Sequence, residues 1–355
     1  MRIRELRSIS AVLVIVIFVG RAFGQEPTEK DPVPTSPLLK VDQLAAQQGG
    51  AIEQLKYARD LNDGILGPRD FKEAFKWFQS ASQLGSTEAS AWLGSMYLLG
   101  TGVDPDPVKA HDLLTAAAVK NDRISYRFLG VMCEGGIIEQ QDYVRALGYY
   151  QKASQLGDAN SFDKRGMLRL SGLGLGRAPK IAFNLFSQGA ALGDQWAELH
   201  LGQMYHYGLG LPSDQPTSPP KPDINQALSW LQASAKQNNR VALYVLGRMA
   251  QAGEGGPPDD KKAFLYFELS ASHRYGPAFV ALGRAHEEGR GTQVNLLHAY
   301  VGYSLAAEQG DADGMSALRQ LSLRLTASEI QQARNMLADF KRMSGDDPQL
   351  TYSPN

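Results

Sequence analysis

The chain has 355 residues, more than the roughly 100 to 200 of one compact domain, so it holds either two domains or one extended repeat array. Its formal charge is −1, and because four of its 36 basic and one of its 37 acidic residues lie within the first 24, the remainder carries −4. This balance argues against a nucleic-acid-binding protein, and we expect no nucleic acid as partner.

The first 24 residues have the pattern of a secretory signal peptide. Three arginines among the first seven residues form a basic start, an apolar stretch runs from Ile9 to Val19, and Ala22-Phe23-Gly24 offers a small-x-small cleavage site. The apolar stretch falls short of the roughly 20 residues that span a bilayer, which argues against an uncleaved membrane anchor. We therefore predict an exported chain, periplasmic or secreted, that begins near Gln25 and has no stable membrane insertion.

A 36-residue period runs through the rest of the chain. A glycine recurs with spacings of 36 residues, apart from one spacing of 45, at Gly94, Gly130, Gly166, Gly202, Gly247 and Gly283. Projecting back by 36 residues gives Ala58 in a degenerate first copy. A second glycine follows each of these seven positions by six residues. The period predicts seven repeats, at 50–86, 87–122, 123–158, 159–194, 195–239, 240–275 and 276–311.

Each repeat is predicted to form two helices, which we call helix A and helix B. In the second repeat, residues 87–99 have apolar residues at helical spacing, and Gly100 follows where a left-handed residue readily ends a helix. A side-chain oxygen precedes helix B as a candidate N-cap at Asp70, Asp106, Asp142, Asp223, Asp259 and Asn295, with Ala178 as the exception. Helix B should close at Gly85, Asn121, Gly157, Gly193, Asn238 and Gly310, with Arg274 as the irregular copy.

The recurrent small residues indicate how the helices pack. Helix B carries an alanine in every copy, with bulky residues three and four positions later, such as Trp77 and Phe78 after Ala74. A glycine inside helix A costs about 1 kcal/mol relative to alanine, so its recurrence indicates a tight helix crossing. One helix pair cannot bury both its faces, and stacked neighbours must supply the core. We predict an all-α fold, an α/α solenoid of seven 36-residue helix-pair repeats.

Both ends of the array are predicted to carry capping helices. Residues 38–49 match the phase of a lone helix B, with Ala45 falling 36 residues before Ala81. Residues 312–345 hold two helices, and Thr326 with Glu329 forms a capping box that opens the second. The proline-rich segment 25–37 is expected to be flexible and the tail 346–355 to be disordered.

The repeat resembles that of the Sel-like repeat family, which is related to the tetratricopeptide repeats. The segments Leu93–Gly102 and Leu201–Gly210 match the pattern L-G-x-M-Y-x-x-G-x-G almost throughout, and the resemblance covers residues 38 to about 343. It implies a protein that assembles complexes or regulates signalling, and for exported bacterial members a place in the envelope or at host surfaces. The fold serves many partners, so the resemblance predicts a protein or peptide partner without identifying it.

Cys133 is the only cysteine, which excludes an intramolecular disulfide. It stands at a repeat position that Tyr97 and Tyr205 fill elsewhere, and a buried apolar role is expected. The cysteine-rich exported branch of the family staples each repeat with a disulfide. Those cysteines are absent here, so the β-lactam binding and hydrolysis of that branch are not carried over to this chain.

Three patterns that carry chemistry elsewhere are read as structural. Ser161 and Lys164 match S-x-x-K without a K-T-G triad, and His286 opens no H-E-x-x-H motif because Arg290 stands at its last position. The glycine run 172–176 follows a predicted helix, whereas a dinucleotide site needs a preceding strand. We predict no enzyme, no cofactor and no metal site. The alternative is an envelope enzyme of the penicillin-recognising serine type or a glycan-binding protein.

One segment interrupts the period. The nine extra residues of the fifth repeat fall in 211–222, a proline-rich loop between its two helices. Such an insertion can be a functional loop or a tolerated surface insertion, and the sequence leaves both open.

The partner is expected in a groove lined by helix A. In the related tetratricopeptide superhelix helix A lines the inner wall. The helix A positions not used for packing lie at −6, −3, +1 and +4 from the repeat glycine, on one helical face. In repeats three to seven these positions select the candidate partner-binding residues Arg127, Glu134, Asp163, Gln203, His206, Tyr244, Arg248, Gln251, Arg284 and Glu287. Tyr244 and Arg248 are the expected anchors, because such residues often dominate interfaces. The alternative is that all ten are solvated polar positions.

Overall fold

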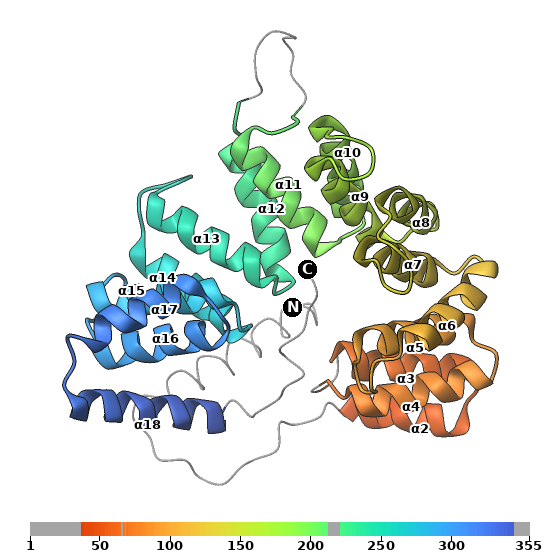
Figure 1. Ribbon diagram of the computed structural model, residues 1–355, viewed down its shortest axis with the longest axis horizontal. Coiled ribbons are helices and arrows are strands. Elements are labelled where there is room, and N and C mark those ends of the chain that lie inside the picture. Colours follow the sequence, from red (N-terminus) through yellow and green to blue (C-terminus); the bar gives the residue numbers. More distant parts are fainter. Residues whose placement is uncertain (1–36, 65–66, 68, 212–220, 344–355) are drawn as a thin grey trace. The chain divides into compact units, whose positions relative to one another are not determined.

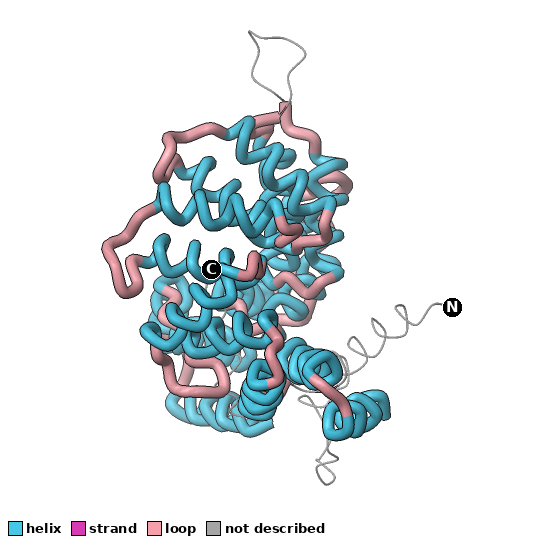
Figure 2. Tube along the Cα trace, turned by 90° about the vertical axis from the view of Figure 1, so that its right-hand side faces the viewer, coloured by secondary structure: helices cyan, strands magenta, loops and turns pink. Residues whose placement is uncertain are grey.

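The computed structural model describes residues 37–64, 67, 69–211 and 221–343. The predicted signal peptide, most of the segment 25–37, the tail 346–355 and most of the loop 211–222 lie outside these residues. The described part of the chain consists of helices and loops, with no strand (Figures 1 and 2). No helix among the described residues is long and apolar enough to cross a membrane.

Seven helix pairs follow one another in the described part of the chain, and each helix of these pairs has 13 residues. The helix preceding them is α2 (Pro37–Gln48). The A and B helices of the first four repeats are α3 (Ala51–Asp63) and α4 (Phe71–Gln83), α5 (Thr87–Leu99) and α6 (Pro107–Val119), α7 (Arg123–Gly135) and α8 (Tyr143–Gln155), and α9 (Ala159–Ser171) and α10 (Pro179–Ala191). Those of the last three are α11 (Gln195–Tyr207) and α12 (Ile224–Lys236), α13 (Arg240–Ala252) and α14 (Asp260–Ser272), and α15 (Gly276–Glu288) and α16 (Leu296–Glu308). Helices α17 (Ala312–Ser322) and α18 (Ala327–Met343) follow the last pair.

The described residues divide into two compact units. One contains the residues up to His200 with 209–211, and the other contains Leu201–Gly208 with the residues from Lys221 onward. Within each unit, a helix A packs most extensively against its own helix B and then against the neighbouring pair. The core is therefore assembled pair by pair, as the period of the sequence predicts.

Helix B begins where the sequence places its caps. The carboxylate or amide oxygen of each predicted N-cap accepts a hydrogen bond from the backbone N–H three residues later, at Asp70, Asp106, Asp142, Asp223, Asp259 and Asn295. Ala178 makes no side-chain cap, also as predicted. Helix A has caps of its own that the sequence analysis did not single out, including Asp122, Asp158 and Asp194. Each cap satisfies an N–H that the helix itself leaves unpaired, and is worth about 1 kcal/mol.

The helices end with left-handed residues. Gly100 closes α5 with φ of 69°, and the equivalent glycine closes every helix A whose C-cap is described. Helix B ends at the predicted glycines and asparagines, and Arg274 adopts the same conformation with φ of 55°. Arg274 thus has the same left-handed backbone conformation as the glycines and asparagines of the other repeats, although this conformation is unfavourable for a residue with a side chain such as arginine.

The recurrent glycine of helix A makes room for helix B. A Cβ at Gly166 would lie 2.4 Å from Cε1 of Phe186, and a Cβ at Gly283 would lie 2.4 Å from Cε1 of Tyr303. In the other repeats that have this glycine, a tyrosine, phenylalanine or leucine at the equivalent position of helix B covers it. The predicted alanines of helix B are buried in all seven copies. Because neither position tolerates a larger side chain, the two helices cross closely and carry the solenoid core.

The capping helices differ in how well the sequence predicts them. Thr326 and Glu329 form the expected reciprocal capping box at the start of α18. At the other end, Ala46 is the fully buried alanine of α2, whereas the repeat phase pointed to Ala45, which is exposed. The buried position of α2 is therefore shifted by one residue relative to the predicted phase.

Candidate functional site

In α7 the predicted groove residues are held by neighbours. The guanidinium of Arg127 forms an ion pair with Asp158 at 3.1 Å, and Asp158 is itself the N-cap of α9. Glu134 accepts a hydrogen bond of 2.6 Å from the hydroxyl of Tyr150. Both side chains link helices within the repeat array, and neither is open to a partner.

In α9 the predicted residue Asp163 is buried, with 4% of its surface exposed. Its carboxylate lies 2.6 Å from Nδ1 of His200, whose ring packs against Phe186. The sequence predicted that the position three residues before the repeat glycine is not used for packing. For Asp163 that prediction is wrong, because His200 of the next helix A covers the carboxylate. Asp163 therefore stabilises the junction between α9 and α11.

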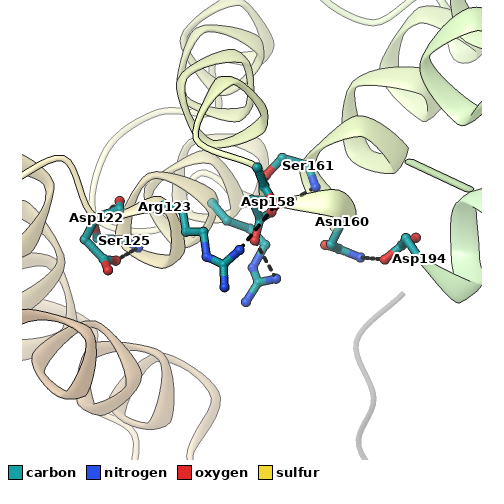
Figure 3. Close-up of polar contacts among 9 residues, drawn as sticks. Asp122, Arg123, Ser125, Asp158, Asn160, Ser161 and Asp194 are labelled. Carbon is teal, nitrogen blue, oxygen red and sulfur yellow. Dashed lines mark hydrogen bonds and ion pairs between the residues drawn. The ribbon is translucent and has the colours of Figure 1, made fainter. Parts of the chain in front are cut away.

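The N-terminal ends of α7, α9 and α11 carry a row of polar contacts (Figure 3). Asp158 accepts from the backbone and hydroxyl of Ser161, Asn160 donates to Asp194, and Arg123 donates to the carbonyl of Gly157. Burial raises the pKa of the carboxyl groups of Asp122 and Asp194. These contacts serve helix capping and the joining of successive repeats.

Ser161 is placed poorly for a nucleophile. Its side chain is fully buried, and its hydroxyl donates to the capping carboxylate of Asp158 at 2.6 Å. The S-x-x-K match thus reflects the third residue of a capped helix. The enzyme alternative therefore has no support at this position.

The remaining candidates lie in the other unit, beginning with α11. His206 contacts Glu254 through Nε2 at 2.5 Å, and Gln203 is partly buried. Glu287 of α15 accepts from the hydroxyl of Tyr303 at 2.7 Å and pairs with Arg324. His206 and Glu287 therefore have partners within the fold.

Four candidates come together at one cavity of about 470 Å³ beside α13 and α15. Its lining includes Tyr244, Arg248, Gln251 and Arg284. The other lining residues are Phe267, Pro277, Val280, Ala281, Ala285, Glu288, Arg290, Asp311 and Asp313. The cavity lining thus combines polar and apolar residues, which is typical of sites that orient a ligand by a few polar groups.

Tyr244 is the most constrained of the four. Its ring centroid lies 5.4 Å from that of Tyr275 in an edge-to-face arrangement and 5.7 Å from that of Phe267. Its hydroxyl accepts a hydrogen bond of 3.3 Å from Arg248. Ring packing holds the tyrosine in place, so little conformational freedom remains to be lost on binding.

No cluster suited to a metal ion occurs among the described residues. Burial raises the pKa of the Cys133 thiol, which disfavours its reactive thiolate. In the described part of the chain, the cavity at α13 and α15 is therefore the remaining candidate site.

Comparison with protein families identifies the repeat. The model of the Sel1 repeat matches seven segments, at residues 54–86, 87–122, 124–158, 164–194, 197–239, 240–275 and 280–311. The chain belongs to the Sel1 repeat family. The seven segments coincide closely with the repeats that the 36-residue period predicts, including the enlarged fifth repeat.

A solved structure of a Sel1 repeat protein supports the same fold. A Sel1 repeat protein from Oxalobacter formigenes is 22% identical, with a TM-score of 0.54, over 91% of this chain and 97% of that one. The uropathogenic Escherichia coli protective antigen c5321, which displays an SLR fold, is 19% identical with a TM-score of 0.40, over 98% and 96%. At such identities the likeness concerns the fold alone.

An uncharacterized protein of Neisseria meningitidis serogroup B is 26% identical over 178 residues. The match covers 41% of this chain and 38% of that protein, so this chain spans well under half of its relative. A Sel1 repeat scaffold suggests protein–protein interaction, which is the general function that these findings support.

Two features of the Sel1 repeats were missed by sequence reasoning, although a signal was present. Where helix B carries tyrosine over the repeat glycine, a glutamate four residues after that glycine receives its hydroxyl, as in Tyr150 with Glu134 and Tyr303 with Glu287. The residue three positions before the repeat glycine contacts the residue 31 positions after itself, as Arg127 contacts Asp158 and Tyr244 contacts Tyr275. These contacts give Arg127 and Glu134 partners within the fold.

Proposed function

We propose that this Sel1 repeat protein is a non-catalytic scaffold or regulatory adaptor that binds a segment of a partner protein in the groove lined by its A helices. The observation that carries the proposal is the cavity at α13 and α15, which gathers four predicted groove residues on two successive A helices. A tyrosine and an arginine beside a cavity are the residue types that most often dominate protein interfaces.

The proposal extends to location. We infer that the chain is exported and acts in the cell envelope or outside the cell, on the pattern of the first 24 residues. Expression of the full chain with its own start, followed by fractionation and mass determination, tests this. We expect an exported product that begins near Gln25, and an intact chain retained in the cytoplasm would contradict the inference.

Binding is tested with random peptides displayed on phage, selected against the chain from Gln25 onward and then measured by fluorescence anisotropy. The Tyr244→Ala/Arg248→Ala variant should bind selected peptides about 2 kcal/mol more weakly, or roughly 30-fold. Because Tyr244 packs against Phe267 and Tyr275, this variant should also melt at a lower temperature, and binding is measured well below that temperature.

Arg59→Ala is the matched control, because Arg59 occupies in α3 the repeat position that Arg248 occupies in α13. This control should keep wild-type affinity. If the double variant also kept it, the groove site would lie elsewhere, and the loop 211–222 would be the next segment to test.

A further inference from the structure

The charged residues that line the cavity at α13 and α15 differ in whether they have a partner among the described residues. Three arginines and three carboxylates line it. Glu288 pairs with Arg290 at 2.8 Å, and Asp311 caps α17 by accepting from the backbone of Gly314 at 2.9 Å. Two of the three carboxylates therefore already have partners.

Arg248 and Arg284 have no carboxylate partner among the described residues. Arg248 donates only to the neutral hydroxyl of Tyr244, and Arg284 is exposed beside the cavity. The two arginines stand directly after the repeat glycines Gly247 and Gly283, one repeat apart on successive A helices. A guanidinium is a planar set of donors that matches a carboxylate, so the pair presents two such donor sets to one cavity.

Apolar residues also line the cavity. Phe267, Pro277 and Val280 contribute side chains that cannot pair with an anion. A small inorganic anion would leave this surface uncovered. A peptide that carries an acidic group next to an apolar side chain would satisfy both parts of the lining.

We propose that this cavity binds an acidic peptide segment, in which a carboxylate is held by Arg248 and Arg284 and a neighbouring apolar side chain packs against Pro277 and Val280. This inference rests on the proposed function, since it names the partner chemistry of the same site. The carboxylate can come from an acidic side chain or from a peptide C-terminus, and the experiment separates these sources.

The test uses three short fluorescent peptides flanked by glycine and serine. The first has two leucines and two glutamates and an amidated C-terminus, the second replaces the glutamates by glutamines, and the third is the glutamine peptide with a free C-terminal carboxylate. Each is titrated against wild type, Arg248→Gln/Arg284→Gln, and the control Arg59→Gln/Arg319→Gln, which removes the same charge from exposed positions outside the cavity.

Wild type should bind the glutamate peptide at least about tenfold more tightly than the amidated glutamine peptide, because charge-assisted hydrogen bonds are worth about 1.5 to 3 kcal/mol. The cavity variant should lose this preference, and the control should keep it. Tight binding of the third peptide alone would assign the carboxylate to a C-terminus and still support the site.

Three results would overturn the inference. Equal binding of glutamate and glutamine peptides, with sensitivity to Tyr244→Ala, would reject the acidic partner and leave the proposed function standing. A glutamate preference that survives in the cavity variant would place the acid-binding residues elsewhere. Failure of all three peptides to bind would reject the acidic segment, while the phage selection would decide the proposed function independently.

Discussion

Helices α7 and α9 differ from α13 and α15 in the contacts that their predicted groove residues make. In α7 and α9 the predicted groove residues Arg127 and Asp163 are held by Asp158 and His200. In α13 and α15 the residues Arg248 and Arg284 face a cavity and lack a carboxylate partner in the described part of the chain. The same repeat therefore supplies structural side chains in one region and available ones in another.

The position three residues before the repeat glycine shows the difference directly. In α7 this residue is Arg127, which pairs with the capping carboxylate of Asp158, whereas in α13 it is Tyr244, which packs against the ring of Tyr275. The contact differs because the N-cap of α15 is a tyrosine and that of α9 is an aspartate. An ion pair therefore joins the helices at one place and an aromatic pair joins them at the other.

The largest expected effect comes from removing a structural carboxylate. Asp163→Ala should lower the free energy of unfolding by about 3 kcal/mol, since it leaves His200 without its buried partner. Arg284→Ala should change it by less than about 0.5 kcal/mol, as at other surface positions. Urea unfolding followed by circular dichroism measures both, and equal midpoints for the two variants would remove the basis of the comparison.

A pH effect is expected within the last repeat. The rings of His286 and His298 lie 5.0 Å apart. Burial lowers the pKa of both, and the neighbouring histidine helps to lower that of His298 to about 4. The unfolded chain therefore binds more protons than the folded one between pH 6.5 and about 4, and stability should fall as pH falls through this window.

Melting temperatures across this window measure the effect. His298→Phe should flatten the decline, and His111→Phe, at a largely exposed position, should not. Glu268, whose pKa is raised by partial burial, contributes in the opposite direction at the acid end. An unaltered slope in His298→Phe would mean that the histidine pair does not govern the acid sensitivity.

The smallest expected effect concerns the loop between α7 and α8. Ile138 has φ of 75° and is largely exposed, while the equivalent position in the last repeat is Gly291 with φ of 71°. A β-branched residue costs about 1 to 2 kcal/mol in this conformation. Ile138→Gly should therefore raise the free energy of unfolding by about 1 kcal/mol, with Ile137→Gly as a control that should not stabilise. No gain for Ile138→Gly would show that the loop carries no such strain.

Most of the fold could be predicted from the sequence because the residues that determine each local feature of the structure recur with the period. The left-handed Gly100 and the buried Ala146 each have a backbone or packing reason that recurs in seven copies, and the N-caps of helix B such as Asp106 recur in six. The exposed Ala45 shows the limit, since the period places it at the position of the buried Ala81, whereas Ala46 is the buried alanine of α2.

The candidate site could be predicted only in part. Helical periodicity places residues on one face of a helix, but it does not say which of them a neighbouring repeat will pair. Asp163 is buried because of His200, which lies 37 residues later and belongs to another repeat. The cavity also needs Arg290 and Asp313, which stand outside helix A positions and which no offset rule would select.

The central claim is that Arg248 and Arg284 are available to a partner while Arg127 is held within the fold. Arginine modification by phenylglyoxal, mapped by mass spectrometry on the folded protein, measures this directly. We expect Arg248 and Arg284 to react rapidly and to be protected by a bound acidic peptide, and Arg127 to react slowly with or without it. Equal reaction rates for Arg127, Arg248 and Arg284 would contradict the account.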